Sequence, residues 1–436
     1  MAGPRRVVGC AGRTPARAAA VRGMLTTAGS LAIAALAAWL LGVGVVLAVC
    51  RNTLSRLWAE PVLCRPVLVL ESDDWGAGPV AQADRLRDIA AVLCRHIDAA
   101  HRPAMFSLAL VLAVPDGPAI EGDGHYRRVE LDDLRLAPVL GALRAGAARG
   151  VFALQLHGFE HYWPPALMAS GDPAVQDWLR GPLPAATEAL PAQLQSRWVD
   201  ASMLPSRPLP SAAIRTAVAG EVAAYARVFG CVPAVVVPPT FVWTTEVERA
   251  WAEHGVRFIV TPGWRSTCRN AAATPDGDEG PIVNGCRAGE LTYLVRTDYF
   301  EPVRGRGAAY ALAALDKAAA QGRPCILENH RDNFIFDPAG RRRSLDELDA
   351  LLAGALRRFP TLRFLATVDL GRILGERDPQ WIVRPWRERL PFFRERLRHS
   401  GRPWKLMRLT GLAVPVALLL RLLGRPPSSR VAGAGS

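Results

Sequence analysis

The stretch "LVLESDDWG", residues 68–76, runs from an apolar segment directly into two adjacent carboxylates, Asp73 and Asp74. A short apolar run of this kind predicts a buried β-strand. Acidic residues are common at the turn between a strand and a helix, where they cap the helix that follows. The doublet therefore has two interpretations, a helix cap or a pair of functional carboxylates, and the rest of the chain decides between them.

From about residue 62 to residue 375, short apolar runs alternate with longer stretches of helical periodicity. Continuous apolar strands separated by helices are typical of a parallel sheet covered by helices. We expect an α/β fold, a distorted (β/α)7 barrel, with an open doubly wound sheet as the alternative. The expected strands are 66–72, 104–112, 151–157, 233–238, 257–262, 325–330 and 362–368, the last of which closes the barrel. The expected helices are 81–100, 131–149, 211–229, 244–254, 307–321 and 344–357.

Two longer segments interrupt this alternation. Residues 158–210 are rich in Pro, Trp and Gly and follow the third expected strand. Long insertions on such a scaffold usually belong to its functional rim. Residues 265–290 are expected to form a second loop or a small hairpin.

The formal net charge of +13 comes from the two ends of the chain. Residues 1–23 contain five arginines and no acidic residue, and residues 376–430 contain thirteen basic and four acidic residues. The middle of the chain is therefore close to neutral. Because a basic patch on the folded middle is not indicated, we expect no nucleic-acid partner.

Residues 24–50 contain no charged side chain and are long enough to cross a bilayer as a helix. A signal peptide is the alternative, but the apolar run is longer than usual and no small-x-small cleavage site follows it. We predict a basic tail over residues 1–23 and an uncleaved, single-pass transmembrane anchor over residues 24–50. The arginine bias puts the N-terminus in the cytoplasm and the catalytic domain on the periplasmic or exoplasmic side, with the cytoplasmic face as the alternative.

The C-terminal tail, residues 376–436, is basic and contains a second apolar segment, residues 409–424. This segment is short and includes Pro415 and Arg421, so we expect it to lie in the membrane interface rather than to cross the bilayer. Basic residues beside it are attracted to anionic lipid. The tail is therefore predicted to be membrane-proximal, with membrane lipid as a partner.

Titratable side chains follow three of the expected strands. Asp73 and Asp74 follow the first strand, His157 and His161 follow the third, and His330 ends the sixth. In barrels of this class the carboxyl ends of the strands form the active-site face. We therefore expect these five side chains to lie close together.

The spacing of His157 and His161 constrains the backbone between them. In an extended strand the two residues would be about 13 Å apart, too far for one metal ion, whereas one helical turn brings positions i and i+4 to within about 6 Å. Gly158 allows the chain to turn directly after the strand. Two imidazoles and a carboxylate suit a divalent metal, zinc first. The alternative is a pair of polar rim residues that bind no metal, and the nearby aspartates favour the metal.

The same segment, "HGFEH", also matches the inverted zinc-peptidase motif H-x-x-E-H. That motif needs a long helix that carries all three residues on one face. Here the segment follows a strand pattern, and the sequence "WPP" at 163–165 interrupts any helix. The peptidase interpretation is therefore the weaker one.

The order and spacing of these motifs resemble a divergent member of the polysaccharide deacetylase superfamily of carbohydrate esterases. In that family a Thr-Phe-Asp-Asp segment supplies the catalytic base and a metal ligand, so the resemblance implies Asp73 as the base and Asp74 as a ligand. The family's H-[S/T]-x-x-H motif implies His157 and His161 as the other ligands. Its histidine at the end of a late apolar strand implies His330 as the general acid.

The sequence departs from the family pattern in several motifs. The family's Arg-Pro-Pro reads Val237-Pro238-Pro239, so the arginine that orients the base is missing. We expect another cation, Arg265 or Arg331, to stand beside Asp73 instead. The other departures are Glu71-Ser72 for Thr-Phe, Gly158 for Ser or Thr, and Trp75 where glycine is common.

The resemblance, which covers residues 62–375, implies a metal-dependent carbohydrate deacetylase, a hydrolase that removes an acyl group, acetyl first, from an amide or ester. The expected substrate is an acylated cell-envelope glycan or a lipid-linked sugar. Trp264 falls where the family has an aromatic pocket residue. Further candidate contacts to sugar are Trp75, Trp163, Trp243 and Pro239. Asp332 either holds His330 in one tautomer or faces solvent, and the sequence favours neither.

Three other functions stay open on the sequence. A catalytically silent, glycan-binding scaffold of a polysaccharide assembly system is motivated by Val237 in place of the arginine. The zinc peptidase is the second alternative. A metal-independent glycosidase is the third, and it depends on Glu328 as a second carboxylate at the strand ends.

Overall fold

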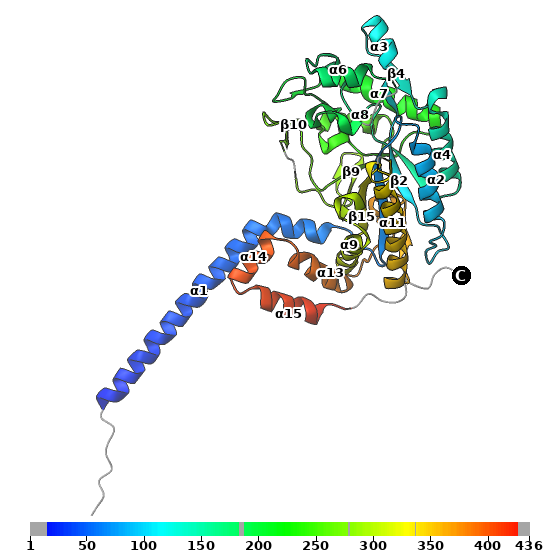
Figure 1. Ribbon diagram of the computed structural model, residues 1–436. Coiled ribbons are helices and arrows are strands. Elements are labelled where there is room, and N and C mark those ends of the chain that lie inside the picture. Colours follow the sequence, from blue (N-terminus) through cyan, green and yellow to red (C-terminus); the bar gives the residue numbers. More distant parts are fainter. Residues whose placement is uncertain (1–14, 183–186, 278–279, 336, 426–436) are drawn as a thin grey trace, which may run out of the picture.

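The computed structural model describes residues 15–182, 187–277, 280–335 and 337–425. Six of the seven expected strands are neighbouring parallel strands of one sheet (Figure 1). Within that sheet, β8 neighbours β9 and β5, β5 neighbours β2, β2 neighbours β1, and β1 neighbours β15. These strands are β1 (Val67–Gly76), β2 (Phe106–Val111), β5 (Phe152–Leu156), β8 (Val235–Val236), β9 (Phe258–Thr261) and β15 (Cys325–His330).

The seventh position is taken by residues 291–299, which join the two edges of this sheet. β13 (Leu291–Val295) pairs in parallel with β9, and β14 (Asp298–Tyr299) pairs in parallel with β15. The predicted (β/α)7 barrel is confirmed, but its closing strand differs from the one expected. Of the segment 362–368, only β16 (Arg363–Phe364) is a strand, and it pairs with the first two residues of β1.

Side chains of β1 alternate between the inside and the outside of the barrel. Val67 and Val69 pack in an inner cluster with Leu370 and Leu374 of α12 (Thr367–Glu376), which therefore fills the amino-terminal end of the barrel. Leu68 points to the other side of the sheet and packs against the outer helices. The inward alternation continues upward to Glu71 and Asp73, so the interior changes from apolar to acidic toward the mouth.

The outer helices pack against the sheet through the large core that contains Leu68, Leu86, Leu143, Val218, Trp251 and Leu351. They are α2 (Gln82–Leu93), α4 (Ala137–Ala148), α7 (Ser211–Phe229), α8 (Thr245–Glu253), α9 (Ala308–Ala320) and α11 (Pro338–Arg358). The smaller helices are α3 (Gly117–Asp123), α5 (Pro164–Met168), α6 (Pro173–Arg180) and α10 (Asp332–Ile335). The short strands at the rim are β3 (Ala113–Pro115), β4 (Arg128–Glu130), β6 (Val199–Asp200), β7 (Arg207–Pro208), β10 (Cys268–Arg269), β11 (Pro275–Asp276) and β12 (Arg287–Ala288).

A long helix, α1 (Pro15–Ala59), leads into the barrel from outside it (Figure 1). Its portion Ile33–Ala59 is long and apolar enough to cross a membrane. The C-terminal helices α13 (Trp386–Arg398), α14 (Arg402–Leu409) and α15 (Ala413–Leu423) lie beside α1. Because α1 precedes β1 directly, it joins the barrel at the amino-terminal ends of the strands, opposite the mouth.

Candidate functional site

The backbone of β1 is irregular at the aspartate doublet. The pairing of β1 with β2 shifts register between Ser72 and Trp75, and Asp74 has a positive φ of 72°. A bulge of this kind re-aims side chains, and a positive φ is strained for a residue other than glycine. The consequence is that two consecutive carboxylates, Asp73 and Asp74, are both buried at the mouth of the barrel.

Asp74 faces both histidines of the third strand end. Its Oδ1 atom lies 3.4 Å from Nε2 of His157 and 3.3 Å from Nε2 of His161. The Nδ1 atom of His157 is 2.7 Å from the backbone carbonyl of Val237, and this contact directs Nε2 toward Asp74. The structure thus brings together the three side chains that the sequence analysis had assigned to one metal ion.

The loop between the two histidines is a bend and not the helical turn that the spacing suggested. Gly158 begins this bend with a φ of 102°, and a Cβ there would lie 2.8 Å from the carbonyl oxygen of Glu160. The carbonyls of Gly158 and Phe159 accept hydrogen bonds from the backbone of Leu112. The loop that positions His161 is therefore fixed against the end of β2.

The residues of this triad fit a divalent cation. Oδ1 of Asp74 is buried and accepts no hydrogen bond from any residue that the structure describes. Its ligand atom and those of His157 and His161 lie within 4.8 Å of one another. Burial lowers the pKa of His161 to about 4, so this imidazole is neutral at pH 7 and its lone pair is available. Burial would raise the pKa of Asp74, but the two histidines outweigh it and the pKa lies below its ordinary value.

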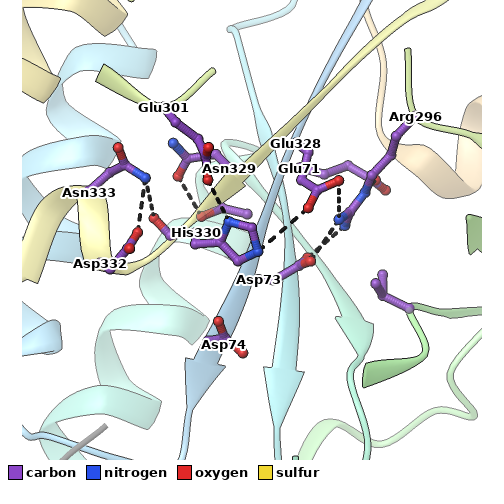
Figure 2. Close-up of polar contacts among 12 residues, drawn as sticks. Glu71, Asp73, Asp74, Arg296, Glu301, Glu328, Asn329, His330, Asp332 and Asn333 are labelled. Atoms are coloured by element: carbon purple, nitrogen blue, oxygen red, sulfur yellow. Dashed lines mark hydrogen bonds and ion pairs between the residues drawn. The ribbon is translucent and has the colours of Figure 1, made fainter. Parts of the chain in front are cut away.

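Asp73 is held by an arginine from the closing strand segment. Nη1 and Nη2 of Arg296 each donate a hydrogen bond of 2.7 Å to the Asp73 carboxylate, and its Nε donates one of 2.6 Å to Glu71 (Figure 2). The carboxylate of Glu328 lies 3.3 Å from the same guanidinium. Burial alone would raise the pKa of Asp73, but Arg296 outweighs burial and the pKa lies below its ordinary value. Asp73 is therefore ionised at neutral pH.

The cation beside Asp73 is not one of the two that the sequence analysis proposed. Arg265 forms an ion pair of 2.7 Å with Glu248, and Arg331 forms one of 3.0 Å with Glu188. Arg296 follows β13 directly, at the seventh strand position of the barrel. An arginine at the position of Val237 would follow β8. In this chain the arginine beside Asp73 follows β13 instead, so it reaches the site from a different strand.

His330, at the end of β15, lies between two carboxylates. Its Nδ1 atom is 3.0 Å from Glu301, and its Nε2 atom is 3.6 Å from Glu328 (Figure 2). Burial would lower the pKa of His330, but the contact with Glu301 and the surrounding carboxylates raise it to about 10. Asp332, a candidate partner of this imidazole, forms an ion pair with Arg304 instead. Of the two interpretations of Asp332, the one in which it holds His330 was wrong, because α10 begins at Asp332 and its carboxylate pairs with Arg304.

The structure separates the candidate aromatic contacts into buried and accessible ones. Trp75 is fully buried and donates a hydrogen bond from Nε1 to Ser72, so it offers no face to a substrate. Trp243 is also fully buried. Trp264 is 48% exposed in the loop after β9, and Trp163 is half-buried beside a pocket of about 850 Å³.

Pro239 is buried at the end of β8, two residues after the Val237 carbonyl that contacts His157. Trp75 is buried because the bulge in β1 changes the side of the sheet that its ring faces, and the ring packs in the core beneath the outer helices.

Glu160 takes no part in the triad, although it is one residue from His161. Its carboxylate lies 2.6 Å from Arg197 and 2.9 Å from Arg128 in a buried cluster on the other side of the loop. The inverted peptidase motif requires this glutamate on a helical face with both histidines. Residues 157–163 contain no helix, so the structure lacks that arrangement.

No protein-family model and no curated protein sequence matches the chain. Solved structures with a similar fold include a Mycobacterium smegmatis protein inferred to be a polysaccharide deacetylase, at 12% identity over 75% of this chain and 98% of that one, with a TM-score of 0.38. A family 4 carbohydrate esterase from Streptomyces lividans, in complex with acetate, is 13% identical over 74% of this chain and 99% of that one, with a TM-score of 0.32. A 4-α-glucanotransferase from Thermococcus litoralis is 11% identical over 70% of this chain and 40% of that one, with a TM-score of 0.36. The likeness to proteins of different activity concerns the fold alone, so any function has to be argued from the site.

Proposed function

We propose that this chain is a metal-dependent hydrolase that removes an acyl group, acetyl first, from a glycan. The observation that carries the proposal is the convergence of Asp74, His157 and His161 beside an Arg296-held Asp73 and a Glu301-held His330. One residue set offers metal ligands, an ionised carboxylate and a protonated imidazole, the three components that metal-assisted hydrolysis of an acyl bond needs.

In this proposal Asp74, His157 and His161 bind the divalent ion. Two imidazole nitrogens and one carboxylate oxygen suit zinc, and three protein ligands leave positions open for water and substrate. When bound, the ion supplies Lewis acidity to the scissile carbonyl and to the attacking water.

Asp73 is the proposed general base. Arg296 keeps its carboxylate ionised and fixes the plane of the carboxylate through two parallel hydrogen bonds, so that it can accept a proton from water. His330 is the proposed general acid. It is protonated at neutral pH, and Glu301 orients its ring, so that it can donate a proton to the departing nitrogen or oxygen.

The contacts of Arg296 weaken the case for a catalytically silent scaffold. That alternative was motivated by the loss of a cation beside the base at Val237. Arg296 supplies a cation on the base from another strand, so the loss does not leave Asp73 unpaired. The glycosidase alternative uses Asp73 and Glu328 alone, and it gives no role to the buried Asp74–histidine triad.

We further propose that the substrate is a cell-envelope glycan and that α1 is an uncleaved membrane anchor. Val46 and Cys50 of α1 are buried, and Val43 and Leu54 pack against the cluster of Leu397 and Met407 from the C-terminal helices. Removal of α1 as a signal peptide would expose this packing. The mouth of the barrel lies at the end opposite α1, which favours a polymer that reaches away from the bilayer. The arginine bias of residues 1–23 favours the periplasmic or exoplasmic side.

Trp264 and Pro239 remain proposed substrate contacts. Trp264 is the more accessible of the two, and an exposed indole in a loop after a barrel strand can stack on a sugar ring.

The proposal is tested by metal content and acetate release from the full chain purified in detergent. We expect about one divalent ion per chain and release of acetate from an N-acetylglucosamine oligomer. The variant His161→Ala should lose both, whereas His96→Ala should keep both, because His96 contacts Asp349 outside the site. A wild-type chain without bound metal would favour the scaffold, and a metal-loaded chain that releases no acetate from amide- or ester-acetylated glycans would contradict the deacetylase.

A further inference from the structure

The helices α13, α14 and α15 form a compact unit against the side of α1. Leu397, Met407, Leu412 and Ala413 make its small core. The indole Nε1 of Trp39 on α1 donates a hydrogen bond of 2.7 Å to the carbonyl of Thr410, in the turn between α14 and α15. α14 and α15 are bent by 110° at this turn. The bend is therefore attached to α1 within the portion that is apolar enough to cross a membrane.

The unit leaves an apolar surface exposed along α15. Its members are Val414, Leu418, Leu419, Leu422 and Leu423, each at least 41% exposed. On the neighbouring α1, Leu31, Ile33, Leu36 and Leu40 are each more than half exposed. Clustered exposed apolar side chains on a soluble protein mark an interaction site. α15 packs against α13 and α14, and both of these helices contact the candidate membrane helix α1. A hydrocarbon environment would cover the exposed apolar side chains of α1 and α15.

Three exposed cations of the unit lie on α14, on the other side of the bend, and a further cation, Arg421, lies near the end of α15. Arg402, Lys405 and Arg408 are exposed, and no residue in the described part of the chain forms a hydrogen bond or an ion pair with their side chains. Residues 396–436 contain no Asp or Glu, and Glu395 of α13 pairs with Arg394 and Arg398 rather than with the cations of α14. Lys405 and Arg408 line a surface pocket of about 690 Å³ together with Trp404 and Leu409.

We propose that the α14–α15 bend is a second membrane-contact site, in which α14 binds the headgroups of anionic phospholipids and the leucines of α15 enter the apolar layer beneath them. An anionic bilayer satisfies both halves of the surface, because its phosphates pair with α14 and its acyl chains cover α15. The indole of Trp39 contacts the turn between α14 and α15, and Trp404 lines the pocket beside Lys405 and Arg408. Tryptophan is enriched where membrane proteins meet the interface. The proposal uses α1 as the anchor and is independent of the reaction at the barrel mouth.

The site is tested with the full chain, freed of lipid in detergent and titrated with phosphatidylglycerol or phosphatidylcholine, while bound lipid is counted by native mass spectrometry. We expect phosphatidylglycerol to bind at least tenfold more tightly. The triple variant Arg402→Gln/Lys405→Gln/Arg408→Gln should weaken phosphatidylglycerol binding about 100-fold, because each basic residue near an anionic surface contributes roughly a factor of five. Binding of phosphatidylcholine and acetate release should not change.

A matched control removes three positive charges from another helix. Arg341→Gln/Arg342→Gln/Arg343→Gln acts in the first turns of α11, which follows the carboxyl end of β15, and it should leave lipid binding unchanged. An equal loss in the control and the α14 variant would show a general charge effect and overturn the site. Displacement of phosphatidylglycerol by millimolar inorganic phosphate would assign a soluble phosphate site instead.

The apolar half is tested by hydrogen exchange of the full chain in anionic nanodiscs. We expect residues 413–423 to be protected relative to detergent, and the variant Leu418→Gln/Leu422→Gln to lose that protection while the barrel keeps its exchange pattern. Equal exchange in nanodiscs and in detergent micelles depleted of lipid, with phosphatidylglycerol binding unchanged, would contradict insertion of α15.

Discussion

Arg296 and Asp73 are joined by two parallel hydrogen bonds of 2.7 Å, although they are 223 residues apart in the sequence. The guanidinium also contacts Glu71 and Glu328, so one cation serves three buried carboxylates at the base of the mouth. A planar fork with two parallel donors fixes both the charge and the orientation of Asp73. The site therefore has an arginine on its proposed base even though the chain has Val237 where the family that its motifs resemble has an arginine.

We predict that Arg296→Gln lowers kcat/KM for deacetylation about 100-fold or more. The substitution leaves three buried carboxylates without a cation, and burial then raises the pKa of Asp73, so the acid limb of the pH–rate profile should move to higher pH. Arg296→Lys keeps the charge without the fork and should give an intermediate loss. Arg265→Lys, on the guanidinium that pairs with Glu248, is the control and should stay within about threefold of wild type.

Glu301→Gln should shift the basic limb of the same profile to lower pH. Glu301 helps to raise the pKa of His330 to about 10, and the proposed general acid loses activity as the pH rises through its pKa. The shift should be about 1 to 2 pH units, because a hydrogen bond to a charged group is worth about 1.5–3 kcal/mol and one unit corresponds to about 1.4 kcal/mol.

Asp332→Asn is the control, since Asp332 pairs with Arg304, and it should leave the basic limb in place.

The contact between His330 and Glu301 also predicts how the stability of the chain depends on pH. Because the pKa of His330 is raised in the folded chain, its contribution is complete below about pH 6.5 and is lost as the pH rises toward 10. Glu301→Gln should therefore lower the melting temperature at pH 7 more than at pH 10. A decrease of the melting temperature by the same amount at both pH values would show that Glu301 stabilises the fold independently of the charge of His330.

Gly158→Ala should weaken metal binding about tenfold to 100-fold. A methyl group at this position meets the Glu160 carbonyl at 2.8 Å, and the φ of 102° is strained for alanine, so the bend that carries His161 has to shift. The measurement is a competition titration of zinc against a chelator. Gly141→Ala is the matched control: it lies in α4 with no atom within 4 Å of the added Cβ, and it should leave zinc affinity unchanged and stabilise the helix by about 0.5–1 kcal/mol.

The sequence was sufficient for six barrel strands and for the clustering of Asp74, His157 and His161 because each of these features has a local signal. An apolar run predicts the strand, and a polar residue at the carboxyl end of that strand is expected at the mouth of the barrel. Arg296 and Glu301, the partners of Asp73 and His330, have no such signal. They follow β13, which comes after a loop and not after a helix, so the alternation that identified the other strands is broken there.

The position of the Trp75 ring has no local signal either. The register shift between Ser72 and Trp75 changes the alternation of β1 and turns the ring into the core. A bulge depends on how the neighbouring strand pairs, and that information lies outside the segment. The same bulge leaves Asp73 and Asp74 both buried at the mouth, so one irregularity of β1 buries the Trp75 ring and assembles the two carboxylates.

Arg396 should prove essential to the junction between α1 and the barrel. It is 1% exposed and donates hydrogen bonds to the carbonyls of Glu60 and Pro61 after α1 and of Gln321 after α9. Arg396→Met removes all of these donors and leaves buried carbonyls unpaired, so we expect a loss of about 3 kcal/mol or more in the free energy of unfolding. Faster cleavage near residue 60 in limited proteolysis should accompany that loss.

The control is Arg398→Gln, two residues later. It removes only an exposed ion pair with Glu395 and should change the free energy of unfolding by less than about 0.5 kcal/mol. Equal stability of the two variants would show that the C-terminal helices do not hold α1 to the barrel.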